Sequence, residues 1–216
     1  MSTLAFIWDL DGTLLDSYGA IVSSLYKTYL EFNIELDREA IRQEVIRTSV
    51  KTFIAKMDEQ TGVPFETMRS RYTEIGTEEK KSIGLMKHAR EILTCLQERG
   101  ARHFVVTHKG DSAHAVLKRL GIYDFFEEII TAKDGFPRKP DPAAVDHLVE
   151  KYGLDRKKTY YVGDRTLDID CAVNAGILSI MYLPEDSPAE ASGKENYIVK
   201  DLMDISEIAE KEMRSC

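Results

Sequence analysis

The chain has 216 residues, of which 43% are hydrophobic and 31% are charged, an ordinary composition for a globular protein with a substantial interior. Its formal net charge of -8 disfavours a nucleic-acid-binding surface, and no apolar run approaches the roughly 20 residues of a membrane-spanning helix. No apolar leader precedes the first expected strand, so we expect a cytoplasmic protein that binds neither nucleic acid nor membrane.

The first expected strand, Ala5–Trp8, is an apolar run that is too short for a helix and suits a fully buried position. Two carboxylates, Asp9 and Asp11, follow it, and Gly12 comes next at an expected turn. An acidic surface turn would explain Asp11 and Gly12, but it would not explain a buried strand that leads into Asp9. Because converging carboxylates repel each other, a divalent cation or a shared proton is expected beside them.

Residues 17–82 are expected to be helical throughout. The first helix is indicated by apolar residues at helical spacing, and three more are predicted over Arg38–Arg47, Val50–Gln60 and Phe65–Glu79. Asp37 is placed to cap the second helix. A connection of this length is too long for a simple crossover between strands. Long connections of this kind usually have a functional role.

Strands and helices alternate after Gly84. We expect strands over His103–Thr107, Glu128–Thr131, Thr159–Val162 and Leu178–Tyr182, and helices over Ala89–Glu98, Asp111–Leu120, Pro142–Tyr152, Leu167–Ala175 and Leu202–Met213. Asp111 is expected to cap its helix, and residues 185–194 are expected to form a surface loop. The alternation predicts an α/β fold, a doubly wound parallel sheet with helices on both faces. In such a sheet the reactive residues lie at the carboxyl ends of the strands.

Polar side chains follow these expected strands. Thr107 ends one strand, Asp164 follows another, and Lys139 lies in a proline-flanked loop before a helix. Each has an ordinary structural explanation: Thr107 as a helix cap, Lys139 as a solvated charge, and Asp164 with Asp168 as a capping pair that stabilises a helix dipole. A single shared site explains all four residues at once, because they fall where a parallel sheet gathers its functional groups.

These residues resemble the four motifs of the haloacid dehalogenase (HAD) superfamily. The motifs are matched in order by Asp9-Leu10-Asp11-Gly12-Thr13-Leu14, by Thr107, by Lys139-Pro140, and by Gly163-Asp164-x-x-x-Asp168 with the following Asn174-Ala175-Gly176. The likeness covers residues 4–16 and 84–182 and is to the phosphoglycolate phosphatase and beta-phosphoglucomutase-like subfamily. It implies a Rossmann-like HAD core from residues 1–16 and 83–216, with residues 17–82 inserted as an all-helical cap domain.

Most members of this superfamily are magnesium-dependent phosphatases, so the resemblance implies hydrolysis of a small phosphorylated metabolite. Asp9 would be the nucleophile that forms an aspartyl-phosphate, and Asp11 the general acid and base. The implied Mg²⁺ ligands are Asp9, Asp11 through its backbone carbonyl, Asp164, and Asp168 as a nearby carboxylate. The implied phosphate-binding residues are Gly12, Thr107, His108 and Lys139, of which Thr107 and Lys139 also count as catalytic.

The sequence departs from the superfamily at one position. The residue after the second-motif Thr is usually Asn, whereas here it is His108, followed by Lys109. We expect the imidazole to face the substrate, with a ring that points away as the alternative. In the inserted segment, Arg47, Ser49 and Lys51 lie at a break between two helices. They would contact the leaving group, or they would form an ordinary solvated helix end.

Other functions are compatible with parts of this set. A phosphomutase of the same superfamily would transfer phosphate between sugar hydroxyls through Asp9, and a non-catalytic protein would bind a phosphorylated ligand on the same fold. A dehalogenase needs neither Asp11 nor Asp164, and a receiver domain is shorter. Cysteine-based phosphatase chemistry is not expected, because neither Cys95 nor Cys171 has an Arg six positions later. The physiological substrate and the oligomeric state stay open.

Overall fold

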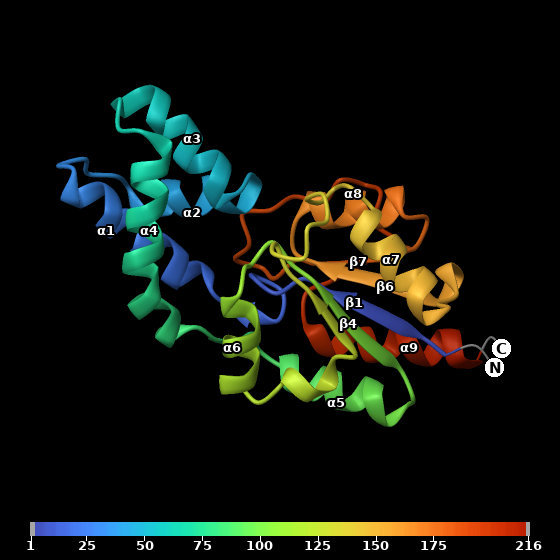
Figure 1. Cartoon of the computed structure of the whole chain (residues 1–216). Helices are drawn as coiled ribbons and strands as arrows, with labels where there is room; N and C mark the ends of the chain where they lie inside the picture. Colours follow the sequence, from blue (N-terminus) through green and yellow to red (C-terminus); the bar gives the residue numbers. More distant parts are fainter. Residues whose placement is uncertain (1–2, 215–216) are drawn as a thin grey trace. The chain divides into compact units, whose positions relative to one another are not determined.

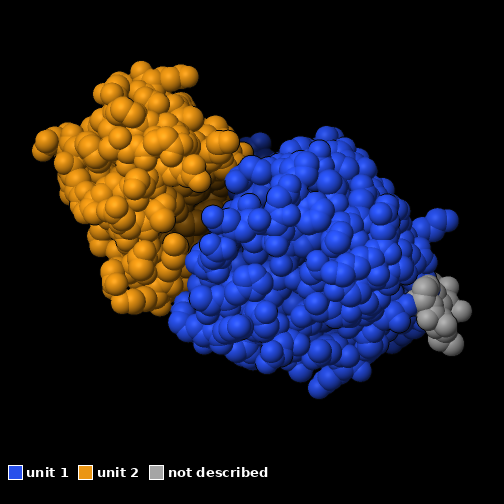
Figure 2. Space-filling view, viewed as in Figure 1, with its two compact units in different colours: residues 1–15, 85–216 blue, residues 16–84 orange. Residues whose placement is uncertain are grey.

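The computed structural model describes residues 3–214, which form two compact units (Figures 1 and 2). Unit 1 contains the described residues of the ranges 1–15 and 85–216, and unit 2 contains residues 16–84. The chain passes between them at two short strands, β2 (Leu15–Asp16) and β3 (Gly84–Leu85), which pair in a two-stranded sheet. Among the described residues, every helix is too short or too polar to cross a bilayer.

Unit 1 is built on a six-stranded parallel sheet with the order β5-β4-β1-β6-β7-β8. Its strands are β1 (Ala5–Trp8), β4 (Arg102–Val106), β5 (Glu128–Ile130), β6 (Thr159–Gly163), β7 (Leu178–Tyr182) and β8 (Tyr197–Val199). The chain goes from β1 to one side for β4 and β5, then crosses to the other side for β6, so the strand order reverses at β1. Such a reversal leaves a crevice at the carboxyl ends of the strands. The predicted doubly wound α/β fold is confirmed.

Helices cover both faces of this sheet. Figure 1 shows α7 (Ala143–Tyr152) and α8 (Thr166–Asn174) on one face and α5 (Ala89–Glu98) and α9 (Ile205–Arg214) on the other. Unit 1 also contains α6 (Ser112–Arg119) and the short 3-10 turns η2 (Tyr123–Phe125), η3 (Arg156–Lys158) and η4 (Leu202–Asp204). The sheet therefore has no solvated face, which is why β1 is apolar at every position.

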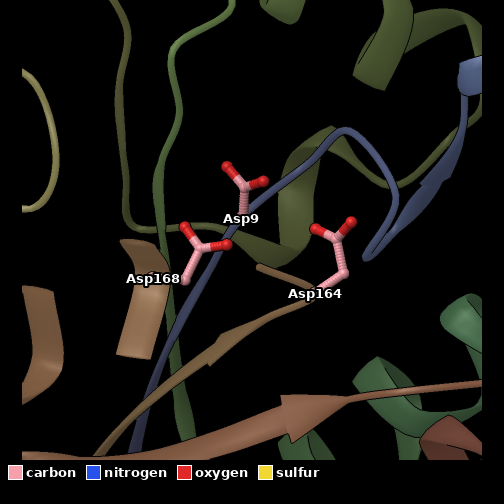
Figure 3. A group of neighbouring side chains, drawn as sticks. All are labelled: Asp9, Asp164 and Asp168. Atoms are coloured by element: carbon pink, nitrogen blue, oxygen red, sulfur yellow. The ribbon is translucent and has the colours of Figure 1, made fainter. Parts of the chain in front are cut away.

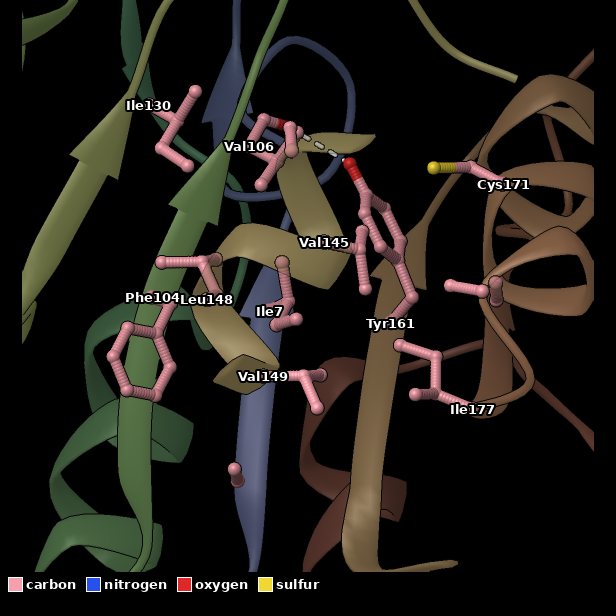
Figure 4. Packing of buried hydrophobic residues seen from close by; sticks show 14 residues of the cluster. Ile7, Phe104, Val106, Ile130, Val145, Leu148, Val149, Tyr161, Cys171 and Ile177 are labelled. Carbon is pink, nitrogen blue, oxygen red and sulfur yellow. Dashed lines mark hydrogen bonds between the residues drawn. The ribbon is translucent and has the colours of Figure 1, made fainter. Parts of the chain in front are cut away.

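Side chains alternate between the two faces of the sheet, as the two-residue period of a strand requires. Ile7, Phe104 and Tyr161 pack with α7 and α8 in one core cluster (Figure 4). Phe6 stacks on Tyr160, and Trp8 lies beside His103, in an aromatic layer within the same sheet. The sheet is thus held by two separate packing layers, and its strand ends are rigid supports for functional groups.

One local prediction in unit 1 was wrong, and one strand was missed. The strand β8 was not predicted, because its three residues are too few to show a strand pattern in the sequence, although all three are apolar. Asp111 precedes α6, but its side chain accepts no hydrogen bond from the helix. The Asp111 backbone already has helical angles, whereas a capping residue needs an extended conformation to direct its carboxylate at the helix.

Unit 2 consists of four helices with a core of their own. They are α1 (Tyr18–Glu31), α2 (Arg38–Arg47), α3 (Val50–Thr61) and α4 (Phe65–Glu79), followed by the 3-10 turn η1 (Lys80–Ser82). Leu25, Tyr29 and Met68 are fully buried in this core. Asp37 accepts a hydrogen bond of 2.7 Å from the Ala40 N–H, so its predicted capping role is confirmed.

Candidate active site

Three buried carboxylates converge at the carboxyl end of the sheet. Asp9 follows β1, Asp164 follows β6, and Asp168 lies in the first turn of α8. One oxygen from each lies within 4.8 Å of the other two, and Figure 3 shows the three side chains coming from separate segments. The convergence follows from the topology, because β1 and β6 are neighbouring parallel strands. Three carboxylates so close together require positive charge beside them.

Lys139 supplies part of that charge. Its ammonium Nζ lies 2.7 Å from Asp9 Oδ1 and 2.5 Å from Asp168 Oδ1. It also donates to the Tyr161 hydroxyl at 2.9 Å and lies 3.3 Å from the Val106 carbonyl oxygen. The Tyr161 hydroxyl in turn donates to Val106 at 2.7 Å, the dashed bond in Figure 4. Lys139 is thus a fully buried cation that bridges two carboxylates.

The pKa values of these groups follow from burial and from their neighbours. Burial opposes the ionisation of Asp9, but the charges of Lys139 and Arg165 outweigh it, so the pKa of Asp9 is lowered. For Asp168, burial and the charge of Asp9 prevail, and its pKa is raised. Burial disfavours the Lys139 ammonium, but its two carboxylates raise its pKa. Asp9 is therefore held as a carboxylate, the form that a nucleophile needs.

The turn from β6 into α8 brings Asp168 unusually close to the strand. A Cβ added at Gly163 would lie 2.4 Å from the Asp168 Cβ, so only glycine fits at this position. Asp168 Oδ2 accepts the Arg165 N–H at 3.2 Å, and Asp164 Oδ1 accepts the Thr13 hydroxyl at 3.1 Å. The absence of a side chain at Gly163 thus allows Asp168 to pack against the end of β6.

Asp11 lies apart from the three-carboxylate group and has a cation of its own. Its Oδ1 accepts a hydrogen bond of 2.6 Å from Lys109 Nζ, and the Lys109 side chain is almost completely buried. The Lys109 N–H also donates to Thr107 Oγ1 at 3.1 Å. Gly12 has a positive φ of 85°, and its N–H donates to the Leu15 carbonyl, so the amide serves the turn. Phosphate contacts from Gly12 and Thr107 stay predictions.

His108 makes a contact that the sequence does not reveal. Its Nε2 accepts a hydrogen bond of 2.9 Å from the Lys139 N–H. Burial, and the positive charges of Lys139, Arg138 and Arg165, lower the pKa of His108 to about 2. The ring is therefore neutral, with its proton on Nδ1. The phosphate contact expected of His108 stays a prediction, and it would have to come from Nδ1 or from the backbone.

In unit 2, the residues predicted to touch a leaving group lie where α2 gives way to α3. Arg47 and Lys51 are exposed, and Ser49 caps α3 by accepting the Thr52 N–H at 3.0 Å. The capping bond gives Ser49 a structural function. Contact between these residues and a substrate stays a prediction.

Two residues of the site were missed in the sequence. Arg165 Nη2 lies 3.5 Å from Asp9 Oδ2, and Lys109 pairs with Asp11. Each is adjacent in sequence to a predicted site residue, since Arg165 follows Asp164 and Lys109 follows His108. A basic residue next to a predicted site residue at a strand end was the signal that could have found both.

The donor set fits a hard divalent cation. All three side chains offer carboxylate oxygens, and among the described residues the buried Asp9 Oδ2 accepts no hydrogen bond. Asp168 differs from Asp9, because both of its oxygens already accept hydrogen bonds, from Lys139 and from the Arg165 N–H. Asp9 and Asp164 are therefore better placed than Asp168 to hold a cation directly.

The chain resembles known hydrolases over nearly its whole length. The model of the haloacid dehalogenase-like hydrolase family matches residues 6–182. A pyrophosphatase PpaX of Oceanobacillus iheyensis is 30% identical over 209 residues, covering 95% of this chain and 96% of that protein. A phosphoglycolate phosphatase of Rhodospirillum rubrum is 27% identical over 184 residues, covering 80% and 76%.

Solved structures agree with the fold. A predicted phosphoglycolate phosphatase from Haemophilus somnus superimposes with a TM-score of 0.85 at 24% identity, covering 97% of this chain and 99% of that one. A hydrolase from Streptococcus pneumoniae is 29% identical with a TM-score of 0.61, covering 83% and 92%. With the motif residues gathered at the carboxyl ends of β1, β4 and β6, and with the family match over residues 6–182, the chain belongs to the haloacid dehalogenase-like hydrolase family.

Proposed function

We propose that the protein is a cytoplasmic Mg²⁺-dependent phosphatase that hydrolyses a small phosphate ester or anhydride through an aspartyl-phosphate at Asp9. The observation that carries the proposal is the buried cluster of Asp9, Asp164 and Asp168, in which the Lys139 ammonium lies 2.7 Å from Asp9. Lys139 and Arg165 lower the pKa of Asp9, which favours its carboxylate form. Relatives named pyrophosphatase and phosphoglycolate phosphatase support a substrate with a transferable phosphoryl group. The cation would be held by Asp9, Asp164 and the Asp11 carbonyl, with Asp168 close by, and would neutralise phosphoryl charge.

The reaction has two steps. A carboxylate oxygen of Asp9 attacks phosphorus, the bond from phosphorus to the leaving oxygen breaks, and Asp11 donates its proton to that oxygen. Asp11 then takes a proton from water, which attacks the aspartyl-phosphate and releases inorganic phosphate and free Asp9. Lys139 stays beside Asp9 and offsets the negative charge that accumulates on the phosphoryl oxygens. The Thr107 hydroxyl would bind one of those oxygens.

The helical cap is proposed to comprise residues 17–82, which lie within unit 2. It has its own hydrophobic core, so it can behave as a separate body during a catalytic cycle. Arg47 and Lys51 are exposed cations suited to an anionic leaving group. Replacing both with Ala should raise KM for a charged metabolite and leave KM for para-nitrophenyl phosphate little changed. An equal rise for both substrates would contradict this role.

The test of the proposed function uses the purified protein and para-nitrophenyl phosphate. Turnover should require Mg²⁺, stop with a chelator and return when Mg²⁺ is restored. Asp9→Asn should abolish turnover, whereas Cys95→Ser is a control distant from the site that should retain it. With a sugar phosphate as substrate, release of free phosphate rather than formation of a phosphate isomer separates a phosphatase from a phosphomutase. Turnover that persists in Asp9→Asn would refute the proposed nucleophile.

A further inference from the structure

The loop that carries Lys139 has no regular secondary structure. It runs from residue 131 to residue 142, between β5 and α7. Its lysine ammonium is nevertheless fully buried and held by Asp9, Asp168 and Tyr161. A lysine side chain is a flexible four-carbon chain that ends in the ammonium. The position of the ammonium therefore depends on how firmly the backbone of the residue is fixed. The groups that fix the backbone therefore also fix the position of the ammonium.

Three side chains form hydrogen bonds with the backbone of three successive residues in this loop, Lys139, Pro140 and Asp141. Asn174 Nδ2 donates to the Pro140 carbonyl at 2.9 Å, and Cys171 Sγ lies 3.4 Å from the Asp141 carbonyl. Both come from α8 and act beyond the lysine. The third contact acts on the lysine residue itself, where the Lys139 N–H donates to His108 Nε2 at 2.9 Å.

We propose that His108 is a positioning residue, whose Nε2 fixes the Lys139 peptide so that the ammonium stays between Asp9 and Asp168. The inference rests on the proposed phosphatase function for its kinetic consequence. His108 comes from the end of β4, so the contact connects the second-motif strand to the third-motif loop. A second bond joins the same segments, because the Ala132 N–H donates to the Lys109 carbonyl at 3.0 Å.

The hydrogen bond from the Lys139 N–H depends on which atom of the His108 side chain accepts it. In the neutral ring Nε2 is the acceptor and Nδ1 carries the proton. A glutamine amide oxygen lies about as far along the side chain as Nε2, whereas an asparagine amide oxygen lies closer to the backbone, near the position of Nδ1. His108→Gln therefore preserves the acceptor, and His108→Asn withdraws it. The two variants have the same charge and the same functional group, so they differ in reach alone.

The kinetic test compares kcat and KM of these two variants. His108→Asn should lower kcat by roughly 10-fold or more, because a small displacement of a charged catalytic group costs this much, with little change in KM. His108→Gln should recover most of that loss. In a Lys139→Met background, His108→Asn should have no further effect on kcat, because a residue that acts through Lys139 has nothing left to position. Equal losses in the two His108 variants, or additive losses with Lys139→Met, would overturn the proposal.

A second measurement needs no activity. Amide hydrogen exchange at Lys139, followed by NMR, should be slow in the unmodified protein and in His108→Gln, and at least 10-fold faster in His108→Asn. Equal exchange rates in all three proteins would show that the hydrogen bond does not hold the loop. If His108→Asn does not fold, fast exchange at Lys139 in His108→Gln still refutes the proposal. Should exchange behave as expected while no protein hydrolyses phosphate, the proposed function fails and the contact stands.

Discussion

Acidification should destabilise this protein through His103, a histidine inside the sheet. His103 lies in β4, is 1% exposed, and accepts a hydrogen bond of 3.1 Å at Nδ1 from Trp8 Nε1. Its ring lies 6.1 Å from the Phe6 ring, in the aromatic layer. Burial lowers the pKa of His103 from 6.5 to about 4. Protonation would bury a charge and turn Nδ1 from an acceptor into a donor that faces the Trp8 N–H.

The size of the effect follows from the two pKa values. In the unfolded chain His103 titrates near its ordinary pKa of 6.5, whereas in the folded protein it titrates near 4. Because the folded pKa is the lower one, the stabilising contribution is complete above pH 6.5 and is lost as the pH falls toward 4. At about 1.4 kcal/mol per pH unit, lowering the pH from 7 to 5 should remove about 2 kcal/mol from the free energy of unfolding.

Urea denaturation at pH 7 and pH 5 measures this loss, with His103→Asn as the matched control. The asparagine oxygen lies near the position of Nδ1 and can accept from Trp8, but it does not titrate in this range. Other groups titrate equally in both proteins, so the difference between their two pH effects belongs to His103. The unmodified protein should lose about 2 kcal/mol more than His103→Asn. Equal losses in both proteins would refute the reasoning.

Three further predictions concern the active site. Lys139→Met should lower kcat by roughly 100-fold or more and leave a measurable residual rate, because one positive group beside the transferred phosphoryl group is lost. It should also lower the free energy of unfolding, measured in urea, by about 3–5 kcal/mol, since two buried carboxylates lose their cation; an unchanged free energy of unfolding would contradict this. Lys109→Gln, which leaves Asp11 without its ion pair, should lower kcat/KM by about 10-fold, and a change below about 2-fold would show that the pair is dispensable. Arg165→Gln should raise the pKa of Asp9, because a positive charge beside the carboxylate is lost. The acidic limb of the pH profile of kcat/KM should then move to higher pH, because Asp9 must be ionised to react. An acidic limb that does not move would exclude Arg165 as the electrostatic partner of Asp9.

The fold was predictable because its signals are local. The apolar run of β1, the alternation of strands and helices after Gly84, and the capping Asp37 each depend on a short stretch of sequence. The edge strand β8 was not predictable in this way, since its three residues are too few to show a periodicity. Convergence of Asp9, Asp164 and Asp168 was also predictable, because parallel topology places strand ends together. Asp11, which was expected to converge with Asp9, lies apart from these three and pairs with Lys109.

The pairing of Lys139 with Asp9 was predictable from the motifs, but the partners of Asp11 and His108 were not. Lys109 pairs with Asp11 across 98 positions of the chain, and His108 reaches the Lys139 backbone across 31. Such pairings are decided by rotamers and by the packing of loops, which have no signature in neighbouring residues. The sequence indicated that His108 departs from the usual asparagine, but only the folded loop indicates which atom of the ring is used.

The way the chain enters and leaves unit 2 makes that unit exchangeable. Its entrance at β2 and its exit at β3 are paired strands, and the Met86 N–H donates to the Leu14 carbonyl beside them at 3.0 Å. A foreign helical insert needs only two adjacent attachment points, which this small sheet already supplies. Grafting inserts from relatives between these strands should therefore alter substrate preference while Asp9, Asp164 and Asp168 keep their positions, because these three aspartates all belong to unit 1.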